Sequence, residues 1–178
     1  MKKNTLILIL LLASTLSFCQ QHEKYVFYVQ GGYKSSGYIK ESGHNEIVSA
    51  KETQHHKCIV LNAGFLVNVA DKWRVGPAFT YDHFGTKRRS AEFSNLSYML
   101  RCDRTWKSAK TYSLYSGASL GIRKVRRFDN EIETGRYTTF GYQVYLIGAE
   151  LKSGSFAIDA NAGYGVSGIL NFGLKCRF

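Results

Sequence analysis

The chain has 178 residues, with 12 tyrosines, 11 phenylalanines, 17 glycines, one proline and a formal net charge of +11. No stretch after residue 19 approaches the roughly 20 apolar residues of a membrane-spanning helix, so a helical membrane protein is excluded. No glycine-rich loop lies between a strand and a helix pattern, and no linker or fixed-period repeat divides the chain, so nucleotide binding and a second domain have no support.

Residues 1–19 have the pattern of a secretory signal peptide, with a basic start, a short apolar run and small residues before a cleavage site. These parts are Lys2 and Lys3, residues 6–13, and Ser17 with Cys19. An alternative is that Cys19 is a lipid-modified first residue, which the bulky neighbour Phe18 disfavours. We therefore predict cleavage before Gln20 and a mature domain at 20–178.

Removal of the signal lowers the net charge from +11 to +9, because Lys2 and Lys3 are lost. A basic exported protein points to anionic lipid or surface polysaccharide rather than to nucleic acid. Three cysteines remain, an odd number at wide spacing: Cys58, Cys102 and Cys176. They form neither a disulfide framework nor a metal pattern, so we interpret them as small apolar fillers.

Alternation of apolar and polar residues recurs from Tyr25 to Phe178, and no helical periodicity interrupts it. We predict eight strands, the smallest number for membrane barrels. They are expected near residues 24–34, 56–69, 73–84, 93–106, 111–125, 137–151, 155–165 and 169–178. The predicted fold is all-β, an eight-stranded antiparallel up-and-down transmembrane β-barrel.

The connections alternate in length. Residues 70–72, 107–110 and 152–154 are expected to form tight turns, whereas 35–55, 85–92 and 126–136 are longer and charged. The last connection, near 166–168, is short and departs from this pattern. Barrels of the outer membrane have short periplasmic turns and long outer loops, so both termini are predicted to be periplasmic.

The alternation sorts side chains onto two faces. In the third strand the apolar face is Trp73, Val75, Phe79 and Tyr81, and the other face is Arg74, Gly76, Ala78, Thr80 and Asp82. In the fourth, Leu96, Tyr98, Leu100 and Trp106 oppose Asn95, Ser97, Arg101 and Asp103. A soluble lipocalin-type barrel would have the same period with the apolar face inward, and the period alone does not distinguish the two.

Two features favour an apolar face directed outward. The polar face is rich in small residues, as a narrow filled lumen requires. The aromatic residues also fall into two levels, as in the girdles at a lipid–water boundary. The periplasmic level is Tyr25, Trp73, Trp106, Tyr112, Phe156 and Phe178, and the outer level is Tyr33, Tyr81, Tyr98, Tyr142 and Tyr164. Pro77 conflicts with a closed ladder, so we expect a bulge or a broken hydrogen bond there.

The C-terminal stretch 171–178 resembles the assembly signal of outer-membrane barrels, with matches at Asn171, Gly173 and Phe178 and a departure at Cys176, where an aromatic is commoner. The mature chain resembles in its architecture the small eight-stranded OmpA/OmpX-type barrels. That resemblance implies a monomer with a plugged lumen, inserted by the barrel-assembly machinery. Roles in the family range over surface structure, adhesion and evasion of host defences, and the fold does not select among them.

The face predicted to line the lumen carries charges of both signs: Arg74, Asp82, Arg101, Asp103, Arg123, Asp159, Lys175 and Arg177. A last hairpin centred on Ser167 would place Asp159 directly opposite Lys175, and Phe156 opposite Phe178. Charges in a narrow lumen must be paired. We therefore favour an ionic plug over a conducting pathway, because eight strands leave room only for side chains.

The outer loops are expected to be basic. The candidate contacts for lipopolysaccharide phosphates are Lys87, Arg88, Arg89, Lys124, Arg126, Arg127 and Arg136. Guanidinium groups bind phosphate bidentately. A merely solvated set of loops is the alternative.

Catalysis has little support. Eight-stranded lipid A acylases and deacylases need a histidine, a serine and an acid at the outer rim. His83 follows Asp82 but is predicted to face lipid, and adjacent His55 and His56 near Cys58 would face opposite ways. We predict no enzyme, cofactor or metal, and a structural or surface-interaction role in which the basic outer loops meet lipopolysaccharide or an unknown host ligand at the surface. The alternatives are a narrow pore for ions or small solutes, and a soluble periplasmic binding barrel.

Overall fold

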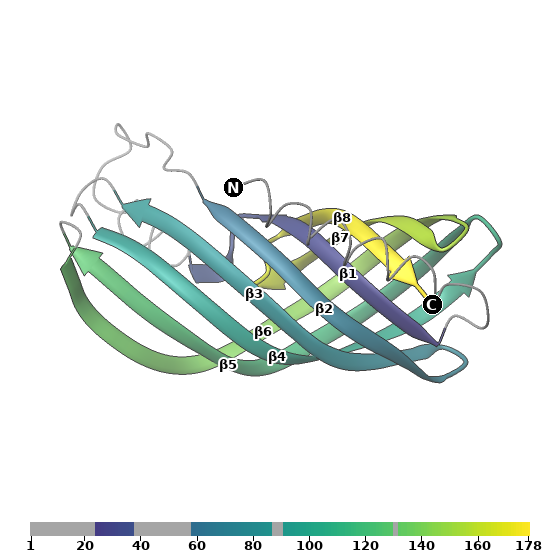
Figure 1. Cartoon of the computed structure of the whole chain (residues 1–178), viewed down its shortest axis with the longest axis horizontal. Coiled ribbons are helices and arrows are strands. Elements are labelled where there is room, and N and C mark those ends of the chain that lie inside the picture. The colour runs from purple at the N-terminus through teal and green to yellow at the C-terminus, as the bar shows by residue number, and fades with distance from the viewer. Residues whose placement is uncertain (1–23, 38–57, 87–90, 130–131) are drawn as a thin grey trace, which may run out of the picture.

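The computed structural model describes residues 24–37, 58–86, 91–129 and 132–178, which form one closed antiparallel barrel (Figure 1). The strands are β1 (Tyr25–Tyr33), β2 (Ile59–Ala70), β3 (Trp73–Thr86), β4 (Ala91–Ser108), β5 (Tyr112–Asp129), β6 (Ile132–Ser153), β7 (Phe156–Gly165) and β8 (Leu170–Arg177). Each pairs with the next, and β8 pairs with β1. The predicted fold class is confirmed.

The last residue helps to close the barrel. The Tyr25 N–H donates to the Phe178 carbonyl at 2.8 Å, and the Phe178 N–H donates to the Tyr25 carbonyl at 3.0 Å. Their rings lie 6.0 Å apart and both contact the ring of Phe65. Gly173 allows β8 to approach β1, because a Cβ there would lie 2.0 Å from the Val29 carbonyl oxygen. Gly173 and Phe178, both in the C-terminal stretch, thus contribute to the pairing of the chain end with β1.

The barrel is taller on one side. Strands β4, β5 and β6 have 18, 18 and 22 residues, whereas β1, β7 and β8 have 9, 10 and 8. Residues 71–72, 109–111 and 154–155 connect strands at one end, the turn end, where Phe178 also lies. At the opposite end, the loop end, β3, β4, β5 and β6 remain paired as far as Thr86, Ala91, Asp129 and Ile132, and β6 projects beyond β7 (Figure 1).

The prediction of loops at 85–92 and 126–136 was wrong. Pairing of β3 with β4 continues to Thr86 and Ala91, and pairing of β5 with β6 continues to Asp129 and Ile132. Where both faces of a strand lie in water, charged residues occupy both and the alternation disappears, although the backbone still pairs. The change to charged residues therefore marks the end of the apolar zone, and the strands continue beyond it.

Adjacent residues show which face is inside. Leu100 is 60% exposed, whereas Arg101 is completely buried. The same contrast recurs around the barrel, and the outward apolar side chains include Phe27, Leu61, Phe79, Leu120, Ile122, Val144, Ile158, Phe172 and Leu174. The apolar face is outward, opposite to the arrangement of a soluble lipocalin-type barrel. No helix in the described part of the chain is long and apolar enough to cross a membrane.

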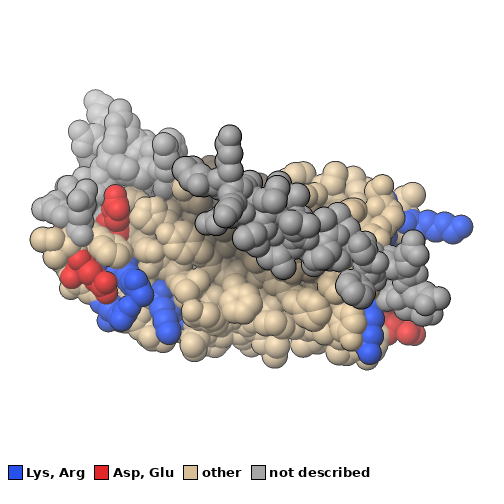
Figure 2. All heavy atoms as spheres, viewed as in Figure 1, with Lys and Arg blue, Asp and Glu red and all other residues tan. Residues whose placement is uncertain are grey.

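Aromatic side chains border this apolar zone on both sides. Trp73, Trp106 and Phe156 are exposed at the turn end. Toward the loop end the exposed rings are Tyr33, Tyr81, Tyr98, Tyr142 and Tyr164. Figure 2 shows the charged side chains of the visible face gathered at the two ends, with an uncharged zone between them. This is the distribution that girdles around a hydrocarbon layer require.

Several strands contain irregularities, and two of these, one in β3 and one in β6, concern predictions made from the sequence. At Pro77, β2 and β3 keep one register on both sides (Gly64↔Ala78 and Val67↔Val75), and the pairing between these positions is interrupted. This is the broken ladder expected there, without a bulge. In β6 the register against β7 shifts between Tyr145 and Ile147. Leu146 and Ile147 both face outward as a result, at 66% and 49% exposure.

Candidate functional site

The lumen near the turn end contains a network of buried charges centred on Glu150. Its Oε1 lies 2.7 Å from Arg74 Nη1 and 2.7 Å from Lys175 Nζ, and its Oε2 lies 2.7 Å from Arg177 Nη2. The Ser113 hydroxyl donates to Oε2 at 2.8 Å. One carboxylate from β6 therefore holds cations from β3 and β8. We call the turn-end network these four charged residues together with Arg101, Asp103 and Asp159.

Asp159 forms the second half of this network. Lys175 Nζ lies 3.0 Å from its Oδ1, the Tyr115 hydroxyl donates to the same oxygen at 2.9 Å, and the Gln30 amide donates to Oδ2. The direct cross-strand pairing predicted for Asp159 and Lys175 was wrong, because Asp159 faces Gly173. The lysine side chain is long enough to reach the carboxylate diagonally.

The register error has a local cause. The last hairpin is centred one residue earlier than predicted, so Lys175 faces Ala157 and Phe156 faces Cys176 rather than Phe178. Glycines with positive φ bound the turn, Gly165 at 148° and Gly168 at 104°. An L side chain rarely adopts these φ values, so the two glycines fix where β7 ends and β8 begins.

Arg101 is completely buried and is the centre of an aromatic cage. Its Nε lies 2.8 Å from Asp103 Oδ1, and its guanidinium lies 4.1, 4.7 and 5.8 Å from the ring centroids of Tyr145, Tyr28 and Tyr115. The network holds four cations, Arg74, Arg101, Lys175 and Arg177, against three carboxylates, Asp103, Glu150 and Asp159. The negative faces of the tyrosine rings offset the excess charge.

A second, smaller ion pair lies toward the loop end. Arg123 Nη2 is 3.0 Å from Asp82 Oδ2, and the Ser35 hydroxyl donates to the same oxygen at 2.5 Å. We call Asp82 and Arg123 the loop-end pair. A neutral chain of amides lies between the two sites, in which Asn62 donates to Asn171 and Asn171 donates to Asn161, each at 2.9 Å.

All eight residues expected in the lumen are buried there, six in the turn-end network and two in the loop-end pair. Sequence reasoning missed Glu150, the carboxylate with the most ion pairs in the network. The bulge at Leu146 and Ile147 changes which residues of β6 face inward. Two adjacent apolar residues in an otherwise alternating strand were the available signal.

Some of the expected phosphate-binding cations share one surface. Lys124, Arg126 and Arg136 are exposed, on the outward face of β5 and β6 beyond the apolar zone; we call them the outer basic surface. Arg126 is the direct cross-strand partner of Arg136. Arg127 is on the opposite face and pairs with Asp129 at 3.2 Å. Lys87, Arg88 and Arg89 lie outside the described residues.

The catalytic and metal candidates do not converge. Asp82 is directed into the lumen, whereas His83 is directed outward and lies 3.9 Å from Glu92. Among residues 24–37, 58–86, 91–129 and 132–178, no three His, Cys, Asp or Glu side chains form a group that could hold a metal. His55 and His56 lie outside these ranges.

No family model matches the sequence, and no curated protein gives a significant match. Among solved structures, the N-terminal β-barrel domain of Pseudomonas aeruginosa OprF is 11% identical, with a TM-score of 0.56 over 89% of this chain and 100% of that one. Neisserial surface protein A is 15% identical, with a TM-score of 0.60 over 88% of this chain and 98% of that one. At such identities the likeness concerns the fold alone, and that fold is the small eight-stranded barrel of the OmpA/OmpX type.

Proposed function

We propose that this protein is an integral barrel of the bacterial outer membrane with a closed lumen and a structural or surface-interaction role. The observation that carries the proposal is the reversal of the usual soluble arrangement, with Leu100 exposed beside a fully buried Arg101. Exposing an apolar zone of this size to water is unfavourable, whereas in a bilayer it is the stable arrangement.

A closed lumen is favoured over a narrow pore by the side chains that meet at its centre. Tyr28, Arg101, Tyr115 and Tyr145 come from four different strands and are almost completely inaccessible to solvent, and the three rings lie around the Arg101 guanidinium. Eight strands enclose only enough space for such side chains. A conducting path would require this cage and its ion pairs to separate.

The orientation follows the usual rule for these barrels. We infer that the turn end faces the periplasm and the loop end faces outward, and that residues 1–19 are removed during export. The assembly machinery would recognise the stretch that contains Asn171, Gly173 and Phe178. These assignments rest on the pattern of connections and on the sequence.

The outer basic surface supports a contact with lipopolysaccharide phosphates. Arg126 and Arg136 face one another across the ladder, which is unfavourable for like charges. Among the described residues, Arg136 forms an ion pair with Glu133 at 3.7 Å, and both side chains are well exposed. A phosphate bound between the two guanidinium groups would neutralise both, and the location just beyond the aromatic level suits a lipid headgroup.

Two measurements test the membrane role. The mature protein should remain in the outer-membrane fraction after alkaline extraction and should migrate differently on gels before and after heating. In planar bilayers it should give no discrete conductance. Recovery as a detergent-free soluble protein would exclude the membrane assignment, and regular single-channel steps would exclude the closed lumen.

A matched pair of double variants tests the phosphate contact. Arg126→Ser with Arg136→Ser should weaken binding of purified lipopolysaccharide to the detergent-folded barrel at least tenfold. Lys72→Ser with Lys110→Ser removes the same charge from exposed positions at the turn end and should leave binding unchanged. Equal weakening by both pairs would mean that only net charge matters.

A further inference from the structure

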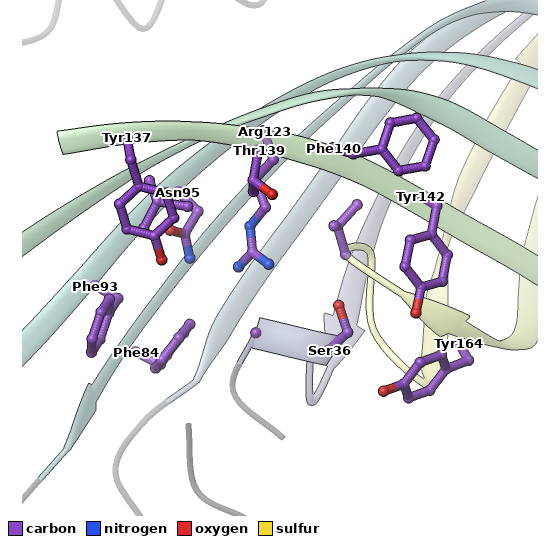
Figure 3. A pocket seen from close by; sticks show the side chains of 13 residues that line it. Ser36, Phe84, Phe93, Asn95, Arg123, Tyr137, Thr139, Phe140, Tyr142 and Tyr164 are labelled. Carbon is purple, nitrogen blue, oxygen red and sulfur yellow. The ribbon is translucent and has the colours of Figure 1, made fainter. Parts of the chain in front are cut away.

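A cavity of about 410 Å³ lies in the loop-end half of the barrel (Figure 3). Its inner lining includes Asn95, Arg123 and Phe84, which are buried. Its outer lining includes Phe140, Tyr142 and Tyr164, which are 64%, 38% and 45% exposed on the outward surface. The cavity therefore joins the polar interior to the aromatic level that borders the apolar zone.

The unequal strand lengths explain this opening. β7 ends at Gly165, which pairs with Gln143 of β6. In the described part of the chain, β6 residues from Ile132 to Tyr142 pair with β5 but not with β7. The wall is thus lower beside the projecting part of β6, and the cavity lies where Tyr142 and Tyr164 face one another at 6.3 Å between ring centroids.

The inner end of the cavity has unused hydrogen-bonding groups. Asn95 is 1% exposed, and neither its Nδ2 nor its Oδ1 has a hydrogen-bond partner among the residues that the structure describes. Arg123 Nε is likewise without one, although its Nη2 donates to Asp82. In Figure 3 the Asn95 amide and the Arg123 guanidinium both point into the space that the labelled side chains surround. Such buried polar groups are costly unless a ligand pairs with them.

We propose that this cavity binds one single-chain amphiphile with a carboxyl head, a molecule of the long-chain fatty-acid class. The head lies at Asn95 and Arg123, and the hydrocarbon chain passes Tyr142 and Tyr164 toward the apolar zone. The proposal goes beyond the function proposed above but rests on its membrane location, because the tail would lie among lipids.

The chemistry of the inner end selects the head group. Among the buried side-chain atoms of the described residues that line the cavity, the Asn95 amide nitrogen and Arg123 Nε are free donors, and Asn95 Oδ1 is the free acceptor. A head rich in acceptor oxygens fits this set, and a protonated carboxyl group can also use the single acceptor. Asp82 already offsets the charge of Arg123, so a weakly charged carboxyl is favoured over a phosphate group. The volume is within the range of small-molecule sites.

The test is native mass spectrometry of the mature barrel released from non-ionic detergent, with oleic acid as the probe. The wild type should retain one oleic acid per barrel. Asn95→Leu should lower the occupancy at least tenfold, and methyl oleate, which has the same tail but no ionisable head, should be retained at least tenfold less than oleic acid. Ser119→Ala is the matched control, because Ser119 Oγ is also buried without a partner but does not line the cavity.

Folding is monitored on the same samples by heat-dependent gel migration and by the urea unfolding midpoint. Since Asn95→Leu removes an unpartnered amide, the midpoint of the ligand-free variant should be equal to or above that of the wild type. Equal retention of oleic acid by wild type and Asn95→Leu would overturn the proposal. Equal retention of methyl oleate and oleic acid would also do so. Either result leaves the membrane assignment intact, because that assignment is tested by fractionation.

Discussion

The two ends of the lumen are filled in different ways. In the turn-end network each carboxylate is shared among several groups, and Glu150 alone contacts three cations. At the loop end, the ion pair of Asp82 and Arg123 lies beside a cavity whose lining includes Asn95 and Arg123. Buried polar atoms without a hydrogen-bond partner occur in both halves, so the two ends differ in the number of shared ion pairs and in the cavity beside the loop-end pair. We expect the turn-end network to contribute most of the stability of the lumen, and the proposed ligand would bind in the other half.

Removal of the central carboxylate should have the largest effect. Glu150→Gln leaves Arg74, Lys175 and Arg177 with one fewer shared anion, so the free energy of unfolding should fall by about 3–5 kcal/mol. Urea titration in detergent measures this loss. Glu133→Gln, which disrupts only an exposed pair with Arg136, is the control and should change little. Equal midpoints for both variants would contradict a stabilising plug.

Loss of one tyrosine ring beside Arg101 should lower the free energy of unfolding by an intermediate amount. Tyr145→Leu removes the ring nearest to Arg101 and should cost about 2 kcal/mol, the upper range for a desolvated cation–π contact. Tyr145→Phe keeps the ring and removes only the hydroxyl, so it should retain most of the stability. If the phenylalanine variant were as unstable as the leucine variant, the hydroxyl rather than the ring would hold Arg101.

The loop-end pair should matter less. Asp82→Asn removes the charge opposite Arg123 but leaves an oxygen for Ser35, so the expected loss is about 1–2 kcal/mol. The comparison with Glu150→Gln under identical urea conditions tests the contrast between the two halves. A larger loss for Asp82→Asn would reverse it.

The smallest effect is expected on the outer basic surface, and its sign should be opposite. Arg126→Glu places an anion across the ladder from Arg136 and should stabilise the lipopolysaccharide-free barrel by about 0.2–1 kcal/mol. The same change should weaken lipopolysaccharide binding. A loss of stability in the absence of lipopolysaccharide would show that the two arginines are not in conflict.

The sequence was sufficient to predict the features that follow from strict alternation of apolar and polar residues along each strand. Leu100 and Arg101 were assigned to opposite faces correctly, and the number of strands was correct, because a bilayer imposes strict alternation over the apolar zone. It was insufficient wherever the backbone departs from that period. The β6 bulge hid Glu150, and the turn bounded by Gly165 and Gly168 moved the last register. The unpartnered state of Asn95 depends on contacts across several strands, which no local pattern encodes.

The central claim is that Leu100 faces lipid while its neighbour Arg101 fills the lumen. The most direct test is a spin label at Leu100→Cys, in a variant whose native cysteines are replaced by alanine, reconstituted in liposomes. The label should collide readily with molecular oxygen and rarely with a water-soluble nickel complex. Free access of the nickel complex to this position would contradict the account.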